Sequence, residues 1–192
     1  LIEYLHIIQD QIGFINKEYM TALASLLSIS QTEVYEVATF YHHFDVINNE
    51  KDIPQSLTIR VCDSVTCEIN GANELAKNLD DYFKGTVRIQ KVPCIGRCQS
   101  APVAVVKFNP IDNANLKNVK QAVDAKEYEP FIPKYINMEE YVDKGGYKLF
   151  NKLKNNEIDS DKVLTELESS NLRGLGGAGF PAGKKWRILK DQ

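Results

Sequence analysis

The chain has 192 residues, of which 43% are hydrophobic and 26% charged, and its net charge is −3 at pH 7. These values are ordinary for a globular protein with one domain or two small ones. The near-neutral charge and the lack of a basic run with aromatics argue against a nucleic-acid binder. No apolar stretch approaches the length of a membrane span, and residues 1–13 are amphipathic rather than a signal sequence. A cytoplasmic location is therefore expected. The start without Met and the end after a Gly-rich motif predict a fragment of a longer protein.

Residues 1–48 are predicted to form a helical bundle. Apolar residues recur at helical spacing in two stretches, and Ser30 with Glu33 forms a capping box that opens a third helix. His42 and His43 follow that helix. Because adjacent histidines point in different directions, a helix-end or interface role is favoured over shared metal ligation.

Residues 56–126 are predicted to form an α/β domain that opens with a strand, a helix and a parallel strand. Residues 57–62 and 86–92 alternate in side-chain character, and residues 72–83 have the helical period. A strand–helix–strand unit of this length places its strands parallel. Residues 103–108 are predicted to form a central strand and residues 116–123 a covering helix. The Ala101–Pro102 bond is expected to be trans, as most X–Pro bonds are.

Four cysteines are the chain's entire complement, and they form two close pairs: Cys62 with Cys67, and Cys94 with Cys98. Each pair begins where a predicted parallel strand ends, so both pairs should lie at one edge of the sheet. Four thiolates there predict a metal site, with a [2Fe-2S] cluster favoured over zinc. Hydroxyls, backbone N–H groups and the charge of Arg97 could stabilise the cluster. Structural thiols or two disulfides are the alternative, but disulfides need an oxidising compartment.

Residues 127–137 are predicted to be a linker and residues 138–192 a separate, mainly helical segment. Ser160 is the predicted cap of a helix there, and Trp186 is expected to be a core residue. A Gly-rich stretch follows the capped helix, with counter-charge from nearby Lys and Arg side chains. Its free backbone N–H groups suit a phosphate-bearing cofactor, and a flexible Gly linker is the alternative. The stretch is neither a Rossmann fingerprint, since a helix precedes it, nor a Walker A motif.

The residues 34–41 (Val-Tyr-Glu-Val-Ala-Thr-Phe-Tyr), the two cysteine pairs and residues 94–102 resemble the thioredoxin-like [2Fe-2S] ferredoxin subunit of respiratory complex I. Residues 141–186 resemble the start of the partner subunit that holds FMN and oxidises NADH. Together they are similar to fused diaphorase subunits, and most closely to the β subunit of NAD-dependent formate dehydrogenase. The resemblance implies an α+β chain in three parts: a helical bundle, a thioredoxin-like [2Fe-2S] domain and the helical start of a truncated FMN/NADH-binding domain.

The resemblance also implies which residues bind cofactors, with no catalytic residue in this chain. The implied ligands of the [2Fe-2S] cluster are Cys62, Cys67, Cys94 and Cys98. FMN and NAD(H) are expected to be bound only by the full-length protein. The residues implied to bind them are Arg173, Gly174, Gly176, Gly177, Ala178, Gly179, Phe180 and Lys185.

The implied function is electron transfer in an NAD-linked dehydrogenase that converts formate and NAD⁺ to CO₂ and NADH. The implied partners are a molybdenum or tungsten catalytic subunit and a ferredoxin-like subunit. The flavin subunit of a bidirectional hydrogenase and a fused complex I subunit are redox alternatives. A zinc-stapled interaction module is the non-redox alternative, while a thioredoxin-like oxidoreductase would need a C-x-x-C site that the sequence lacks.

Overall fold

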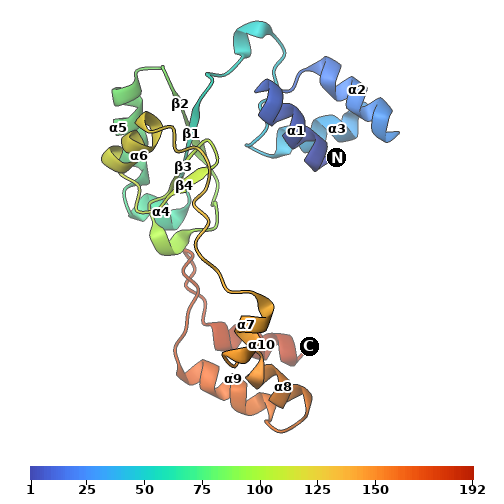
Figure 1. The fold of residues 1–192 in the computed structure, drawn as a ribbon, viewed down its shortest axis with the longest axis vertical. Helices are drawn as coiled ribbons and strands as arrows, with labels where there is room; N and C mark the ends of the chain where they lie inside the picture. The colour runs from blue at the N-terminus through green and yellow to red at the C-terminus, as the bar shows by residue number, and fades with distance from the viewer. The chain divides into compact units, whose positions relative to one another are not determined.

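The computed structural model describes residues 1–192 and divides into two compact units, Leu1–Glu129 and Pro130–Gln192 (Figure 1). The boundary lies inside the predicted linker 127–137. None of the helices is both long enough and apolar enough to cross a membrane. The helical bundle and the α/β part lie within one compact unit. The predicted division into domains 1–48 and 56–126 therefore stays a prediction.

The first unit opens with three helices, as the periodicity predicts: α1 (Ile2–Ile12), α2 (Lys17–Leu27) and α3 (Gln31–Phe40). Gly13 ends α1 in the left-handed region at φ 92°. The capping box is confirmed, since the Glu33 N–H donates to Ser30 Oγ at 3.1 Å and the Ser30 N–H donates to Glu33 Oε2 at 2.9 Å. The helices enclose a small core of Leu5, Ile15, Met20, Leu23, Ala24, Val34, Ala38 and Phe44.

A four-stranded sheet with the order β2-β1-β3-β4 forms the centre of the same unit. Its strands are β1 (Thr58–Cys62), β2 (Arg88–Val92), β3 (Ala104–Val106) and β4 (Asn109–Ile111). The pair β1 and β2 is parallel, as predicted, whereas β3 runs antiparallel to β1 and β4. The predicted strand 103–108 is shorter than expected, because the chain turns at Lys107 with φ 58° into β4. The Ala101–Pro102 bond is cis, so the expectation of a trans bond was wrong.

Helices α5 (Ala72–Phe83) and α6 (Leu116–Asp124) contact each other and cover one face of the sheet (Figure 1). Ile59 and Val61 of β1 join their core, while Thr58 and Arg60 alternate toward the other face. A five-residue helix, α4 (Val65–Ile69), follows β1, and short 3₁₀ helices occupy Glu50–Asp52 and Cys98–Ser100.

The helical bundle is joined to the sheet along a seam in which Asp45 pairs with Arg88 of β2. Arg88 donates to the two Asp45 carboxylate oxygens at 2.6 and 2.8 Å, and its Nε–H donates to Thr58 Oγ1 at 2.9 Å. The Gln9 side chain adds a 3.1 Å bond to Asp45 Oδ2. Because the Asp45 side chain is only 12% exposed, this ion pair ties the two parts together out of bulk water.

The second unit contains α7 (Met138–Asp143), α8 (Lys148–Lys154), α9 (Ser160–Ser169) and α10 (Ala182–Lys190). Asp159 rather than Ser160 caps α9, since its side chain accepts from the Asp161 N–H. Trp186 is 58% exposed, which corrects the expectation of a core residue. Helices α9 and α10 pack so closely that a Cβ on Gly183 would lie 2.6 Å from the Glu168 backbone nitrogen.

Candidate metal centre

The two cysteine pairs meet at one edge of the sheet because β1 and β2 are parallel and in register. Cys62, the last residue of β1, is paired with Val92, the last residue of β2, and Cys94 follows two residues later. Cys67 lies in the short helix α4, and Cys98 begins the 3₁₀ turn Cys98–Ser100. The predicted convergence of the two pairs is thus what the backbone produces.

The four sulfur atoms form one connected group. Cys94 Sγ lies 3.6 Å from Cys98 Sγ, the Cys67 thiol is hydrogen-bonded to that of Cys62, and Cys98 interacts electrostatically with both buried thiols. The pairs differ in exposure, since Cys62 and Cys67 are 1% and 2% exposed whereas Cys94 is exposed and Cys98 partly so. The group therefore has an inner, dry half and an outer half that faces solvent.

Several donors point at these sulfurs, as expected for ligands of an anionic cluster. The Gly96 N–H lies 3.4 Å from Cys94 Sγ, and Gly96 has φ 82°, a conformation that glycine adopts without strain. The Thr66 hydroxyl is hydrogen-bonded to Cys98, and the Val103 backbone to Cys67. Such bonds to sulfur stabilise the negative charge of a thiolate-bound centre.

Without a bound cation, Cys67 and Cys98 favour the neutral thiol. Burial, together with the hydrogen bond to Cys62, raises the pKa of Cys67 to about 11. The hydrogen bond to Cys94 is the main cause of the raised pKa of Cys98. A metal centre would have to displace these protons, so its assembly is coupled to proton release.

Four thiols in one group supply the ligand set of either a zinc ion or a [2Fe-2S] cluster. A tetrahedral zinc with Zn–S bonds of about 2.3 Å holds its four sulfurs about 3.8 Å apart. Cys94 Sγ and Cys98 Sγ, 3.6 Å apart, have about this separation. The residues present fit either centre, and the hydrogen-bond donors to the sulfurs described above favour the anionic [2Fe-2S] cluster.

Arg97, expected to act on the cluster by its charge, is paired instead with Asp112. Its Nε–H and Nη2–H donate to the two carboxylate oxygens at 2.7 and 2.6 Å. This pairing holds the pKa of Asp112 below its usual range. The net charge that Arg97 presents to the cysteines is thus close to zero.

The Gly-rich stretch of the second unit forms a closed loop between α9 and α10. The Gly174 N–H donates to the Phe180 carbonyl at 3.1 Å, and the Gly179 N–H donates to that of Gly176 at 3.0 Å. Arg173 pairs with Pro181 in an isolated bridge and donates from Nη1 to the Gly179 carbonyl at 3.2 Å. The structure brings together at this loop Arg173, Gly174, Gly176, Gly177, Ala178, Gly179 and Phe180, with Lys185 in the first turn of α10. Phe180 is 49% exposed, and a pocket of about 240 Å³ lies beside the base of the loop.

A third cluster was missed from the sequence. The sequence pointed only to His42 as a neighbour of His43. In the structure His43 lies beside His6 and Asp10, and the donor atoms of these three residues all lie within 4.8 Å of one another. The four-residue spacing of His6 and Asp10, which puts both on one side of a helix, was the available signal. His43 also borders the seam with the sheet, and its expected helix-end or interface role stays a prediction.

Comparison with known proteins gives one family match and several related subunits. The family model described as thioredoxin-like [2Fe-2S] ferredoxin matches residues 1–127. One NADH-quinone oxidoreductase subunit of Aquifex aeolicus is 34% identical over 111 residues, which are 53% of this chain and 66% of that relative. A second NADH-quinone oxidoreductase subunit of the same organism is 40% identical over 56 residues, 29% of this chain and 13% of that relative. The chain thus spans just under two thirds of the first relative and a small part of the second.

Among solved structures, an NAD⁺-reducing [NiFe]-hydrogenase in the air-oxidised state superposes with a TM-score of 0.54. The superposition covers 98% of this chain and 36% of the hydrogenase chain, at 20% sequence identity. At this identity the likeness concerns the fold alone.

Proposed function

This chain belongs to the thioredoxin-like [2Fe-2S] ferredoxin family, and from that premise we propose that its four cysteines hold one [2Fe-2S] cluster that passes single electrons. The observation that carries the proposal is the meeting of both cysteine pairs at the joint carboxyl ends of β1 and β2. The proposed ligands are Cys62, Cys67, Cys94 and Cys98.

The protein's own task at this site is to place and tune the sulfurs. Burial of Cys62 and Cys67 excludes water from one half, while the Gly96 N–H and the Thr66 hydroxyl offset negative charge on the ligands of the other half. The cluster, when bound, supplies one-electron chemistry. Four thiolates kept free for iron suit a reducing compartment, and this supports a cytoplasmic location as part of the proposal.

The second unit is proposed to be the beginning of an FMN- and NADH-binding domain. A closed, glycine-rich loop that leads into a helix is suited to phosphate, and the 56-residue match to the second Aquifex aeolicus subunit supports the same assignment. Lys185 is proposed to lie near the flavin phosphate and Phe180 to stack on NADH. Because flavin accepts two electrons from NADH and releases them singly, it would link NAD(H) to the cluster. FMN is expected to be retained only by a protein that extends beyond these residues.

We propose that the whole protein is the diaphorase component of an NAD-linked dehydrogenase, with formate as the first electron donor to test. A molybdenum or tungsten subunit and a ferredoxin-like subunit are the proposed partners. Hydrogen and the quinone-linked respiratory chain are the alternative redox couples, in keeping with the names of the relatives.

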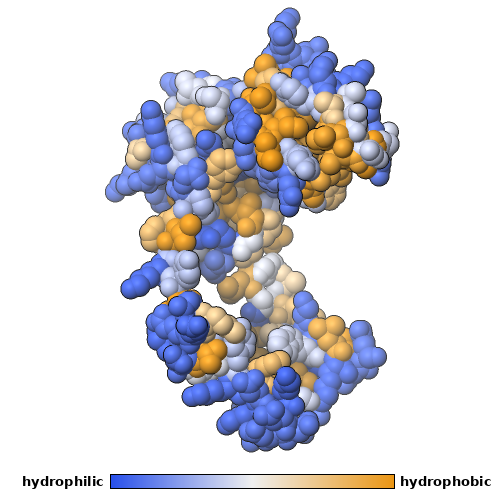
Figure 2. Space-filling model, turned by 45° about the vertical axis from the view of Figure 1, so that its right-hand side comes forward, coloured by the Kyte–Doolittle hydropathy of each residue, from blue (hydrophilic) through white to orange (hydrophobic).

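Work within a multisubunit assembly is also supported by the surface of the helical bundle, where Figure 2 shows an area of hydrophobic side chains. An apolar groove there is lined by Tyr4, Ile7, Ile8, Tyr19, Ala22, Leu23 and Leu26. Large exposed apolar patches are typical of protein–protein contacts.

The test of the cluster is its iron and its colour. The purified chain is expected to contain two irons and two acid-labile sulfides and to absorb visible light, whereas a zinc-stapled module would be colourless. Cys94→Ser should bleach the protein. Ser64→Ala is the control, since the Ser64 side chain makes no capping bond to α4. Stoichiometric zinc with no sulfide in the chain would refute the proposal.

The test of the wider proposal uses the longer protein with its partner subunits. Formate-dependent reduction of NAD⁺, abolished by Cys94→Ser, would support the formate assignment. Hydrogen-dependent reduction without a formate-dependent rate would replace it by the hydrogenase alternative.

A further inference from the structure

We propose that His6, Asp10 and His43 form a second metal site, which takes a divalent transition-metal ion such as Zn²⁺ and lies apart from the four cysteines. Two of the donors come from α1, and the third comes from the turn after α3. The inference rests on the geometry of the three donor atoms and does not depend on the cluster assignment.

The donor atoms are already close to the separation that one ion requires. All three lie within 4.8 Å of one another, and His43 Nε2 is 3.7 Å from Asp10 Oδ1. Ligand atoms on a tetrahedral zinc, with bonds of about 2.0 to 2.2 Å, are about 3.3 to 3.6 Å apart. The His6 and His43 rings have centroids 4.6 Å apart and are tilted by 46°. Small side-chain movements would therefore complete the site.

The backbone holds the three side chains together. His6 and Asp10 are four residues apart in α1, so they project from the same side of the helix. The turn that carries His43 is fixed by Arg60, whose Nη2–H donates to the His43 carbonyl at 3.4 Å. The His43 ring also packs edge-on against Phe44 at 5.5 Å. Site formation thus needs little new ordering of the chain.

The state of His43 suits a metal ligand. Its Nε2 atom is buried and lies 3.7 Å from Asp10 Oδ1, beyond the length of a good hydrogen bond, so that a metal ion bound by both atoms would improve the pairing of each. Burial, Arg60 and His6 lower the pKa of His43 while Asp10 raises it, and the net shift is downward.

The surrounding charges set the limits of the site. Asp10 supplies one negative charge to the ion. Arg60 and Lys107, which line the adjoining pocket, oppose a cation, although Asp45 interacts with Arg60 and offsets part of its charge. Two imidazoles and one carboxylate leave a fourth position for water, as in zinc sites with three protein ligands.

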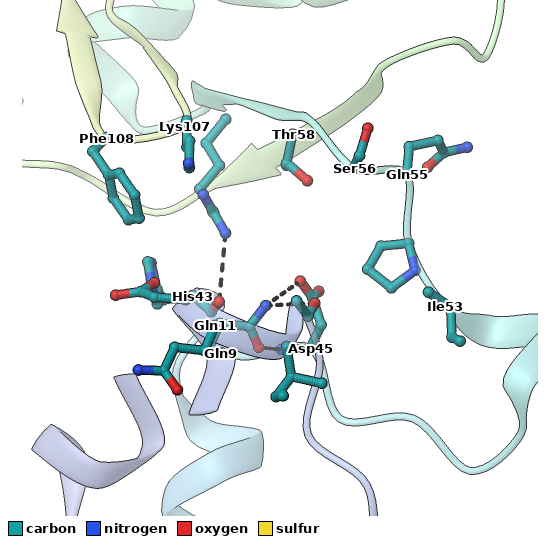
Figure 3. Close-up of a pocket in the computed structure, with 15 residues that line it drawn as sticks. Gln9, Gln11, His43, Asp45, Ile53, Gln55, Ser56, Thr58, Lys107 and Phe108 are labelled. Atoms are coloured by element: carbon teal, nitrogen blue, oxygen red, sulfur yellow. Dashed lines mark hydrogen bonds and ion pairs between the residues drawn. The ribbon is translucent and has the colours of Figure 1, made fainter. Parts of the chain in front are cut away.

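The location suggests what the ion does. His43 borders a polar pocket of about 400 Å³ on the seam, with Asp45 on its own side and Lys107 and Phe108 across from it (Figure 3). An ion that binds α1 to the turn at His43 would fix that turn against the sheet. The proposed role is therefore a clamp on the seam.

The experiment uses the cluster-loaded, oxidised chain labelled with ¹⁵N-histidine, so that the cysteine thiolates are occupied. The chain has 3 histidines, and each imidazole can be followed separately in long-range ¹H–¹⁵N spectra during titration with Zn²⁺. Saturable shifts of the His6 and His43 rings at one ion per chain, with His42 unmoved and the cluster absorbance constant, are expected. Absence of shifts, or equal shifts of all three rings, would overturn the proposal.

Variants test the same point by calorimetry. His6→Ala should lower the Zn²⁺ affinity by about tenfold or more, as loss of a metal-site group typically does. His42→Ala is the matched control, because His42 is adjacent to His43 but does not belong to the proposed site. This variant should change the Zn²⁺ affinity less than about twofold. Equal effects of both variants would contradict the site. The histidine spectra of the unsubstituted chain decide the matter if His6→Ala fails to fold.

Discussion

Breaking the Asp45–Arg88 pair should measure how firmly the helical bundle is held to the sheet. Exposed ion pairs contribute about 0.2 to 1 kcal/mol, whereas removing one partner of a buried pair costs about 3 to 5 kcal/mol. The two side chains are 12% and 24% exposed and share two short hydrogen bonds. Asp45→Asn, which leaves the Arg88 cation half-buried without a counter-charge, should therefore cost about 2 to 3 kcal/mol. This corresponds to a fall in Tm of about 6 to 12 °C.

A double-mutant cycle in urea, followed by circular dichroism, isolates the pair from other effects of each substitution. Asp45→Asn, Arg88→Gln and the double variant are compared, and the double variant should lose less than the sum of the two. The same cycle on Glu140 and Lys144 is the control, because their ion pair is about half exposed and should contribute less than about 0.5 kcal/mol. A coupling energy for Asp45 and Arg88 no larger than that of the control would refute the reasoning.

Three further outcomes are expected. Gly183→Ala should lower the Tm of the second unit by several degrees because its Cβ would meet the α9 backbone, whereas Gly176→Ala, which has open space around it, should leave Tm unchanged; equal Tm values would contradict this. Thr66→Val should lower the cluster's reduction potential and Thr66→Ser should restore it, because the Thr66 hydroxyl bonds to Cys98. The shift should be about 40 mV for each kcal/mol by which the hydrogen bond stabilises the reduced state more than the oxidised state. An unchanged potential in a potentiometric titration would count against this role of Thr66. Arg187 holds the pKa of Glu168 below its usual value, so the stability that this pair adds is present above about pH 4.3 and is lost as the pH falls through the depressed value. Thermal scans at falling pH should therefore show a loss that is smaller in Glu168→Gln than in the unsubstituted chain.

The sequence predicts the parts of this fold that depend on local patterning. The capping box at Ser30 needs only two residues three apart, and both of its hydrogen bonds form. The strand–helix–strand unit follows from a change of hydrophobic period. Since its strands must be parallel, the meeting of Cys62 and Cys94 at one edge follows from topology without any knowledge of packing.

Features that depend on packing or on very short elements were not predictable in this way. Helix α4, which carries Cys67, has 5 residues, too few for a periodic pattern. The partner of Arg97 is Asp112, fifteen residues away along the chain and fixed by the packing of two loops. His43 meets α1 only through tertiary structure, so neither its spacing nor its neighbours in the sequence point to the group.

The unequal exposure of the two cysteine pairs has a consequence for electron flow. A cluster held by these cysteines would have Cys62 and Cys67 on a buried side of low dielectric constant and Cys94 on the side that meets water. An added negative charge is stabilised where solvent can polarise around it. The electron of the reduced state should therefore reside on the outer iron, and the shortest tunnelling route to a redox partner should leave the protein past Cys94.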